Sequence, residues 1–398
     1  MILKPNFTYI DLFAGIGGFH CAMDSISGGK AKCIFASEID DQARKVYKEN
    51  FGIEPLGDIR LIDPLLYPAP DVVCGGFPCQ TFSKAGNQKG LKDSRGTLFR
   101  EIVRIVTSYP EQERPKILLL ENVRNLVSHD EGQTWKIIRR EIEQAGYNIP
   151  DVPIILAPKD IGVPQLRDRA IIMAVRSDLF AKPLELSIER KKHNVTSIDS
   201  IVSTDLFGAE SLTNEQLYLL NAWDVFINGI NTKVVGFPIW SDEFGKNYSL
   251  ETLPDWKRSI IEKNRKLYLE NKTFIDRWYK EYGIRKKYKP TMRKFEWQAG
   301  SKMKSVFDGI IQFRTSGIRV KLPTESPSLV AMVHLPIIGP LKRTVSVREA
   351  ARLQSFPDDF TFDESSKLAF KQLGNAVNVK VIEHCFRKFL RYIDKKEG

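Results

Sequence analysis

One cysteine in this chain lies where a side chain could act as a nucleophile. Residues 70–80 read Pro-Asp-Val-Val-Cys-Gly-Gly-Phe-Pro-Cys-Gln, which predicts a short buried strand, a glycine pair and a rigid Phe-Pro step before Cys79. Residues 81–96 are rich in Gly, Lys, Ser and Gln and predict a polar loop. A thiol at a strand end beside such a loop suits covalent catalysis under a closing lid. The alternative is a structural cysteine, because unpaired cysteines are among the most buried residue types.

A carboxyl group follows a second apolar segment. Residues 115–123 read Pro-Lys-Ile-Leu-Leu-Leu-Glu-Asn-Val, which predicts a strand covered on both faces, as in a parallel sheet, with Glu121 near its end. Partial burial favours the neutral form of a carboxyl group, so Glu121 could donate a proton at neutral pH. A capping or salt-bridged glutamate is the alternative.

Two arginines lie just before a further apolar strand, predicted over residues 170–175. In an extended segment Arg167 and Arg169 point the same way, because side chains alternate between the two faces. Two guanidinium groups on one face could bind a carboxylate, a carbonyl or a phosphate. An ordinary salt-bridge site is the alternative.

A glycine-rich turn near the start of the chain predicts a nucleotide-type site. Residues 7–13 predict a strand, residues 14–18 a turn and residues 19–26 a helix, and a second strand ends at Glu38. A carboxylate about 20 residues past the glycines is placed to accept ribose hydroxyls. Asp58, after the next helix candidate, could accept an adenine amino group. The full dinucleotide pattern and a phosphate-binding lysine are missing, which favours an adenosine ligand without a pyrophosphate. A plain turn of a doubly wound fold is the alternative.

Composition narrows the class of protein. The chain has 398 residues, 42% hydrophobic and 27% charged, which suits a globular protein with room for two domains. We find no apolar run that could span a membrane and no secretory leader. The cysteines, at positions 21, 33, 74, 79 and 385, show no metal-binding or disulfide spacing, so we expect a reducing cytoplasm and no metal.

The positive charge is concentrated in one segment. Residues 257–321 contain 19 Lys or Arg against 6 Asp or Glu, a balance of +13, whereas the whole chain carries +11 and the remainder therefore −2. Such a basic segment suits a polyanion, and a solvated helical face is the alternative. Residues 259–282 predict a helix. Residues 310–314 and 318–322 predict a hairpin.

The order of the elements predicts a doubly wound, mostly parallel α/β domain with a smaller mixed domain inserted into it. Alternating strands and helices stop near residue 182 and return near residue 346, and a helix predicted over residues 379–393 ends the chain. We therefore expect a first catalytic and cofactor part at 1–185 and an inserted recognition domain at 186–340. Residues 341–398 would form a hinge and return to the first domain.

Several of these segments, in this order, resemble the bacterial-type DNA (cytosine-5) methyltransferases of restriction-modification systems. The resemblance covers about the first 180 and the last 50 residues. It depends on residues 11–19 (Asp-Leu-Phe-Ala-Gly-Ile-Gly-Gly-Phe), 75–83 (Gly-Gly-Phe-Pro-Cys-Gln-Thr-Phe-Ser), 121–123 (Glu-Asn-Val), 165–169 (Gln-Leu-Arg-Asp-Arg), 348–354 (Arg-Glu-Ala-Ala-Arg-Leu-Gln) and 372–375 (Gln-Leu-Gly-Asn).

The resemblance implies a Rossmann-like methyltransferase fold that uses S-adenosylmethionine and releases S-adenosylhomocysteine, with no metal. The residues it implies for cofactor binding are Phe13, Ala14, Gly15, Ile16, Gly18, Glu38, Ile39, Asp58, Ile59, Pro78, Leu98, Asn375, Ala376 and Val377. Phe13 would stack on the adenine, and Glu38 would accept the ribose hydroxyls.

The resemblance also implies the catalytic roles. Cys79 would add to C6 of a cytosine flipped out of double-stranded DNA, Glu121 would bind N3, and Arg169 with Arg167 would hold O2. Candidates for DNA contacts are Gln80, Ser83, Lys84, Gln88 and Arg95 in the closing loop, with Arg293, Arg314 and Arg319 for base reading. We expect a monomer in a bacterial cytoplasm, on the nucleoid when bound to DNA, with a cognate restriction endonuclease as partner.

Two other functions stay open at this point. One is a tRNA cytosine-5 methyltransferase on the same scaffold. The amino-acid sequence of residues 75–83 and the basic insert favour DNA over this alternative. The other is a binding protein that keeps the cofactor pocket without catalysis, against which the intact set of Cys79, Glu121 and Arg169 argues.

Overall fold

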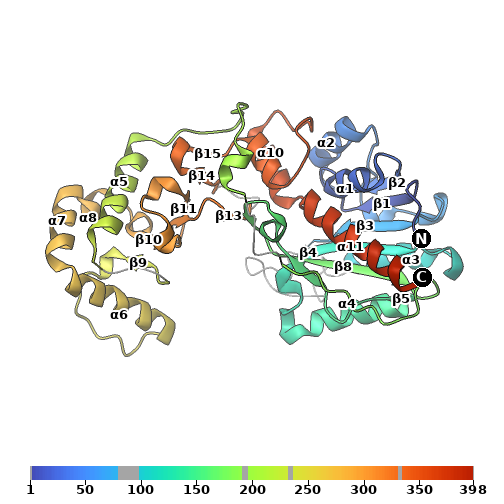
Figure 1. Ribbon diagram of the computed structural model, residues 1–398, viewed down its shortest axis with the longest axis horizontal. Helices are drawn as coiled ribbons and strands as arrows, with labels where there is room; N and C mark the ends of the chain where they lie inside the picture. Colours follow the sequence, from blue (N-terminus) through green and yellow to red (C-terminus); the bar gives the residue numbers. More distant parts are fainter. Residues whose placement is uncertain (1, 79–97, 191–195, 232–235, 330–333, 398) are drawn as a thin grey trace. The chain divides into compact units, whose positions relative to one another are not determined.

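The computed structural model describes residues 2–78, 98–190, 196–231, 236–329 and 334–397. The chain divides into two compact units (Figure 1). Unit 1 comprises Met1–Val195 and Ala350–Gly398, and unit 2 comprises Thr196–Glu349. Both boundaries lie somewhat later in the chain than the predicted positions 185 and 340.

The sheet of unit 1 has the strand order β2-β1-β3-β4-β8-β5, and β6 also pairs with β8. Its strands are β1 (Thr8–Leu12), β2 (Lys32–Ser37), β3 (Val72–Gly76), β4 (Ile117–Val123), β5 (Tyr147–Asn148), β6 (Ile154–Leu156) and β8 (Arg169–Arg176). The strands from β2 to β4 are parallel, whereas β8 runs antiparallel to β4, β5 and β6. Since β5 and β6 are both antiparallel to β8, they run in the same direction as β1 to β4, and β8 is the one reversed strand among those described in this sheet. The prediction of a mostly parallel sheet is confirmed, but the reversal of β8 was not predicted. Strand β8 is apolar because both of its faces are buried. An apolar run of this kind does not reveal whether the strand is parallel or antiparallel to its neighbours.

Helices cover this sheet. The helices of unit 1 are α1 (Gly18–Ser27), α2 (Asp41–Phe51), α3 (Leu98–Ser108), α4 (Gln133–Gln144), α10 (Ser366–Asn375) and α11 (Val379–Glu397), while α9 (Val347–Leu353) begins in unit 2 and ends in unit 1. Contacts join α1 to α11 and α3 to α4 (Figure 1). Within the described ranges, no helix is long and apolar enough to cross a membrane.

The alternation of side chains along β1 assigns its two faces. Ile10 and Leu12 belong to the apolar core that includes residues of α3 and α4. Tyr9 and Asp11 point to the other face, where the Tyr9 ring lies 5.6 Å from the ring of His20 on α1. The sheet is thus covered on both sides, as the doubly wound pattern predicts.

Unit 2 combines a mixed sheet with a group of helices. Its strand order is β15-β14-β11-β12-β10-β9, and its aromatic core includes Trp223, Phe226, Trp278 and Phe295. The strands are β9 (Ile239–Trp240), β10 (Lys294–Trp297), β11 (Ile310–Arg314), β12 (Gly317–Lys321), β14 (Ile337–Ile338) and β15 (Arg343–Thr344). The helices are α5 (Asn214–Gly229), α6 (Asp255–Glu270), α7 (Lys272–Tyr282) and α8 (Ile284–Lys287). Strands β11 and β12 form the predicted hairpin.

Residues 259–282 are helical as predicted, except for a break that divides them into two helices. Asn271 separates α6 from α7, with φ −127° and ψ 23°. Its side-chain oxygen accepts a hydrogen bond from the backbone N–H of Asn231 at 2.8 Å, a tertiary contact that favours the break.

Candidate active site

The strand order of unit 1 creates a topological switch point at β1. Strand β1 pairs with β2 on one side and with β3 on the other. In open α/β sheets, ligands bind in the crevice outside the carboxyl ends of the strands at such a point. The turn that begins at Phe13 follows β1, and Phe77 and Pro78 follow β3. The predicted cofactor turn and the segment that leads to Cys79 therefore begin at neighbouring strand ends.

The turn after β1 has an unusual backbone that Glu38 holds in place. Phe13 has φ 56°, a left-handed conformation that costs a non-glycine residue about 1–2 kcal/mol. Gly15, with φ 55°, donates its N–H to Glu38 Oε2 at 2.8 Å, and Asp40 donates its N–H to Glu38 Oε1 at 2.8 Å. The carboxylate at the end of β2 thus fixes the turn at the end of β1.

The last segment of the chain returns to this turn. A methyl group built on Gly18 would lie 2.7 Å from Val377 Cγ2, and one built on Gly76 would lie 3.6 Å from Val377 Cγ1. Because Gly18 has no side chain, Val377 can lie against both the start of α1 and the end of β3. Asn375 ends α10, and Ala376 follows it. The predicted cofactor residues from the two ends of the chain therefore come together.

Glu121 lies beside the segment that leads to Cys79. Its side chain is 12% exposed, and Oε1 lies 2.8 Å from Arg169 Nε. A methyl group built on Gly76 would lie 3.9 Å from Glu121 Oε2. The next residue, Asn122, is buried and donates its side-chain N–H to the carbonyl of Phe77 at 3.1 Å. Strand β4 thus places a carboxyl group and an anchor for the segment after β3 side by side, and β8 supplies the cationic partner, Arg169.

Arg167 lies differently from the prediction that it shares a target with Arg169. Its Nη2 donates to the carbonyls of Gly374 at 3.0 Å and Ala376 at 2.9 Å. Alternation fails here because Arg167 lies between strands β7 (Gln165–Leu166) and β8, outside the extended segments. Arg167 therefore supports the returning segment that includes Val377.

The remaining predicted cofactor residues lie around the same strand ends in different settings. Asp58 accepts hydrogen bonds from the backbone and side chain of Arg60, and it caps the short helix Ile59–Leu61. Ile39 is 68% exposed, whereas Ile59 is buried in the core. Pro78 follows β3, and Leu98 begins α3. The exposed Ile39 and the half-buried Pro78 and Leu98 keep apolar surface that a ligand could cover.

Burial makes the described cysteines poor nucleophiles. It raises the pKa of Cys33 and of Cys385 to about 12. It also raises the pKa of Cys21 and of Cys74, which lies on β3. Because the thiolate is the reactive form, these thiols do not suit covalent catalysis.

The remaining cysteine, Cys79, and the candidates Gln80, Ser83, Lys84, Gln88 and Arg95 lie outside the described residues. Their predicted roles stay predictions.

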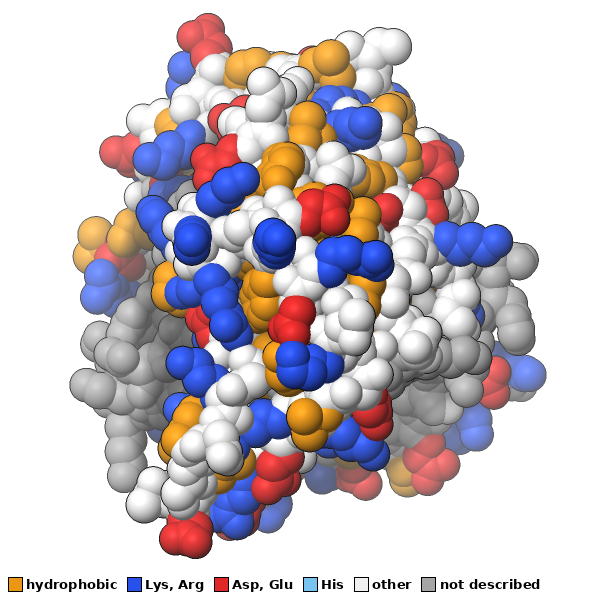
Figure 2. All heavy atoms as spheres, turned by 90° about the vertical axis from the view of Figure 1, so that its left-hand side faces the viewer, with side chains coloured by type: hydrophobic (Ala, Val, Ile, Leu, Met, Phe, Trp, Pro, Cys, Tyr) orange, Lys and Arg blue, Asp and Glu red, His pale blue; other side chains and the backbone are white. Residues whose placement is uncertain are grey.

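The arginines predicted to read bases form ion pairs inside unit 2. Arg314 Nη2 lies 2.5 Å from Glu296 Oε1, and Arg319 Nε lies 2.8 Å from Glu296 Oε2. Arg293 pairs with Asp242 at 3.1 Å. On the face that carries α6, α7 and α8, Figure 2 shows many Lys and Arg side chains with fewer acidic ones between them. Exposed members include Lys263, Lys266, Lys272, Arg277, Lys280, Arg285, Lys286, Lys287 and Lys289.

Sequence reasoning overlooked Asn122 and gave no role to Asp11. Asp11 is fully buried on β1, and its carboxylate oxygens have no hydrogen-bond partner among the described residues. Burial raises the pKa of Asp11 well above its usual value. A polar residue inside an otherwise apolar strand is the signal that marks both positions.

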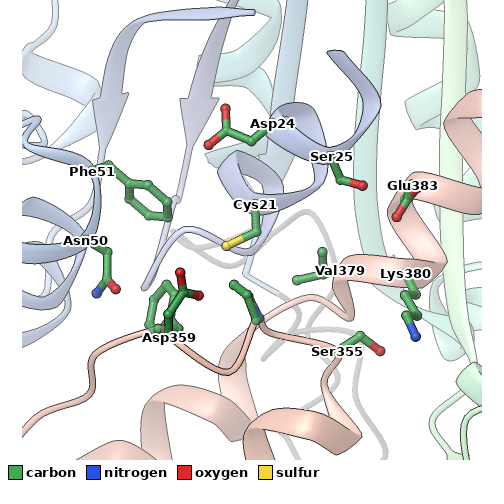
Figure 3. Close-up of a pocket in the computed structure, with 12 residues that line it drawn as sticks. Cys21, Asp24, Ser25, Asn50, Phe51, Ser355, Asp359, Val379, Lys380 and Glu383 are labelled. Carbon is green, nitrogen blue, oxygen red and sulfur yellow. The ribbon is translucent and has the colours of Figure 1, made fainter. Parts of the chain in front are cut away.

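A cavity of about 420 Å³ lies elsewhere on unit 1 (Figure 3). Cys21, Asp24 and Phe51 line it from α1 and α2, and Lys380 and Glu383 line it from α11. None of the predicted site residues that the structure describes is among its lining residues. In the same described part of the chain, no group of His, Cys, Asp and Glu is arranged to hold a metal.

Known proteins resemble this chain over most of its length. Type II methyltransferase M.AluI of Cellulosimicrobium cellulans is 32% identical over 98% of this chain and 92% of its own. Type II methyltransferase M.HpaII of Haemophilus parainfluenzae is 31% identical over 98% of this chain and 90% of its own.

Solved structures share the fold. Entamoeba histolytica methyltransferase EhMeth has a TM-score of 0.56 and 18% identity and covers 98% of this chain and 99% of its own. A putative DNA modification methyltransferase from an Escherichia coli prophage has a TM-score of 0.55 and 21% identity, with the same coverage.

The profile of a family described as C-5 cytosine-specific DNA methylase matches residues 7–391. This match spans both units and favours DNA over the tRNA alternative. The chain belongs to the C-5 cytosine-specific DNA methylase family and is a DNA (cytosine-5)-methyltransferase.

Proposed function

We propose that this enzyme methylates C5 of a cytosine flipped out of a short sequence in double-stranded DNA, through a covalent bond between Cys79 and C6. S-adenosylmethionine would supply the methyl group. The observation that carries the proposal is the position of Glu121, paired with Arg169 and next to Gly76 and Phe77, the residues that lead to Cys79.

The chemistry requires a nucleophile because C5 of cytosine reacts poorly with a sulfonium methyl group. Addition of the Cys79 thiolate to C6 makes C5 an enamine carbon that can attack the methyl group. A base then removes the C5 proton, the bond between sulfur and C6 breaks, and the thiolate is restored. The described cysteines cannot replace Cys79, since burial raises the pKa of each of them.

Glu121 and Arg169 would stabilise the charge that develops on the ring. A protonated Glu121 would donate to N3, while Arg169 would orient Glu121 and hold O2. A positioned acid of this kind contributes roughly 10²–10⁴-fold to the rate. The short Glu121–Arg169 contact supports the part of this assignment in which Arg169 orients Glu121.

The switch point of the sheet suits the adenosine part of the cofactor. Glu38 already accepts from the turn and retains lone pairs for the ribose hydroxyls. Phe13 and the exposed Ile39 would contact the adenine, and Asp58 would accept its amino group. Ile59 would line the adenine edge beside Asp58. Ala14, Gly15, Ile16, Gly18, Asn375, Ala376 and Val377 would surround the methionine part, with Pro78 and Leu98 as walls.

The DNA contacts come from the basic segment and the loop after Cys79. Flipping a base costs a few kcal/mol, which contacts from Gln80, Ser83, Lys84, Gln88 and Arg95 would offset. The named relatives are Type II methyltransferases, so we place the enzyme in host-DNA protection, beside a cognate endonuclease in a bacterial cytoplasm. It would act as a monomer.

Replacement of Cys79 tests the proposal directly. Cys79→Ala should abolish methyl transfer, because no other thiol can add to C6, while calorimetry should show near wild-type affinity for S-adenosylmethionine. A duplex with 5-fluorocytosine at the target should form an adduct with the wild-type enzyme that survives a denaturing gel. Full activity of the variant, or no adduct on a verified target, would remove the mechanism. Cys385→Ala, at a buried cysteine on α11, is the matched control.

A further inference from the structure

One face of the unit 2 sheet is polar over β10, β12 and the end of β11, whereas Ile310 and Ile338 make the same face apolar where β11 pairs with β14. Along β10, β12 and β11, alternate residues such as Phe295, Ile318 and Ile311 belong to the apolar core. The other face carries Lys294 and Glu296 from β10, Arg319 and Lys321 from β12, and Gln312 and Arg314 from β11. We call these six residues the polar face. Four cations and one carboxylate give it a formal charge of +3.

Glu296 organises this face. It lies opposite Arg319 in the register of β10 and β12, and Arg319 lies opposite Gln312 in the register of β12 and β11. Its Oε1 is 2.5 Å from Arg314 Nη2, and its Oε2 is 2.8 Å from Arg319 Nε. Gln298 also donates to Oε2 at 3.1 Å. One carboxylate thus orients two guanidinium groups.

The Arg319 guanidinium keeps its terminal donors available. Its Nε contacts Glu296, and in the part of the chain that the structure describes its terminal nitrogens have no hydrogen-bond partner. Its side chain is 26% exposed, compared with 19% for Arg314 and 19% for Glu296. Arg314 is more constrained, because its Nε is buried without a partner.

We propose that Arg319, held by Glu296, reads a guanine in the major groove through its terminal nitrogens. This inference rests on the proposed function, since it assumes duplex DNA on unit 2. A guanidinium that donates from two nitrogens matches O6 and N7 of guanine, the commonest specific side-chain contact to DNA. A guanidinium whose plane is fixed by a carboxylate is prepared for a bidentate contact, and since arginine also forms such contacts with phosphate, the experiments below separate a base edge from a phosphate. Glu296 is the positioning residue.

The first experiment uses the wild-type enzyme and modified DNA. Bisulfite sequencing of DNA from a methylation-free host expressing the chain defines the methylated word. Each guanine of that word is then replaced in a synthetic duplex by 7-deazaguanine, which lacks N7. An inosine duplex, which keeps N7 and O6, is the control. At one guanine, 7-deazaguanine should lower kcat/KM by roughly ten- to a hundredfold, and inosine should not.

The second experiment assigns that guanine to Arg319. Arg319→Gln should lose the sensitivity to 7-deazaguanine at this position and should accept other bases there. Glu296→Gln, which keeps Arg319 but weakens its fixed orientation, should show the same change to a smaller degree. Arg139→Gln is the matched control, because Arg139 lies on α4 of unit 1 between the carboxylates of Glu143 and Asp151. The Arg139→Gln variant should methylate the same DNA sequence as the wild type and keep the sensitivity to 7-deazaguanine.

The outcomes separate the two proposals. If no guanine responds to 7-deazaguanine, or if Arg319→Gln responds as strongly as the wild type, the assignment is wrong while methylation itself still supports the proposed function. If the wild-type chain methylates no cytosine at C5, the proposed function fails instead. Should Arg319→Gln be inactive, competition binding of the same duplexes gives the same comparison.

Discussion

At the scale of single residues, unit 1 holds a buried polar group on α1, the helix that follows the turn after β1. His20 on α1 is 8% exposed, its Nδ1 is 2.7 Å from the Tyr47 hydroxyl, and its ring stacks on Phe51 at 3.8 Å. Burial lowers the pKa of His20 to about 4. The imidazole therefore stays neutral in the folded protein, although Asp24 lies 3.6 Å from its Nε2.

This burial predicts a loss of stability in mild acid. The folded pKa of His20 lies below the unfolded value near 6.5, so the unfolded state binds more protons as pH falls through this window. From pH 7.5 to 5, His20 alone should lower the free energy of unfolding by about 2 kcal/mol. Urea denaturation of the wild type and of His20→Asn at both pH values measures this. The drop should be smaller in the variant by that amount, and an equal drop in both proteins would contradict the assignment.

For Glu121 we expect an effect on catalysis. Glu121→Gln keeps the shape of the side chain but cannot supply a proton to N3, and it leaves Arg169 without its charged partner. We expect kcat to fall by roughly 10²–10⁴-fold. Single-turnover methylation measures the chemical step, and Glu111→Gln, at an exposed glutamate of unit 1, is the control. A variant with wild-type single-turnover rates would exclude the acid role.

At the scale of elements, the site depends on close approaches between segments far apart in the sequence. Gly18 at the start of α1 admits Val377 from the segment before α11. Arg167 holds that segment through the carbonyls of Gly374 and Ala376. Asn122 on β4 holds the Phe77 carbonyl after β3. Each contact joins an element of the sheet region to a segment that would contact cofactor or base.

Gly18→Ala tests the approach of the final segment. The new methyl group would lie 2.7 Å from Val377 Cγ2 and 3.1 Å from its carbonyl oxygen, so the segment must shift. We expect a loss of about 1–3 kcal/mol in the free energy of unfolding, as for other overpacked sites, and weaker binding of S-adenosylmethionine. Denaturation and calorimetry measure the two effects.

Gly57→Ala is the matched control for stability. A methyl group there would meet only Arg44 Nη1, at 3.5 Å, so stability should change little. Equal stability losses at Gly18 and Gly57 would show that the contact with Val377 is unimportant.

At the scale of the whole molecule, the positive charge is concentrated in one segment of unit 2. The segment 257–321 of unit 2 carries +13, whereas the rest of the chain carries −2. Exposed lysines of α8 and the residues after it, Lys286, Lys287 and Lys289, belong to this segment. Such a distribution favours phosphate contacts from unit 2.

The salt dependence of DNA binding tests whether the basic segment 257–321 contacts phosphates. If Lys286, Lys287 and Lys289 each contact a phosphate, replacing all three by Gln should reduce the slope of log K against log salt by about 3. The control replaces Lys4, Lys30 and Lys32, exposed residues at the amino ends of β1 and β2, on the edge opposite the switch point. Its slope should not change. An unchanged slope in the first variant would place the DNA elsewhere.

The sequence by itself determined the family, the order of the elements and the position of the basic segment. These features are local: motif residues, apolar periodicity and charge are written in consecutive positions. Most helices and strands of unit 1 were predicted within a few residues for this reason, as were the strand ends that carry Glu38 and Glu121.

Only the tertiary structure decided which of these residues meet. The antiparallel direction of β8 was hidden, because a strand buried on both faces is apolar in either direction. Three further features depend on contacts between residues far apart in the sequence. Arg167 and Arg169 have different partners, and Val377 packs against Gly18. Glu296 pairs with both Arg314 and Arg319. Such contacts depend on how strands pair and helices pack, and that information is spread over the whole chain rather than held in any one segment.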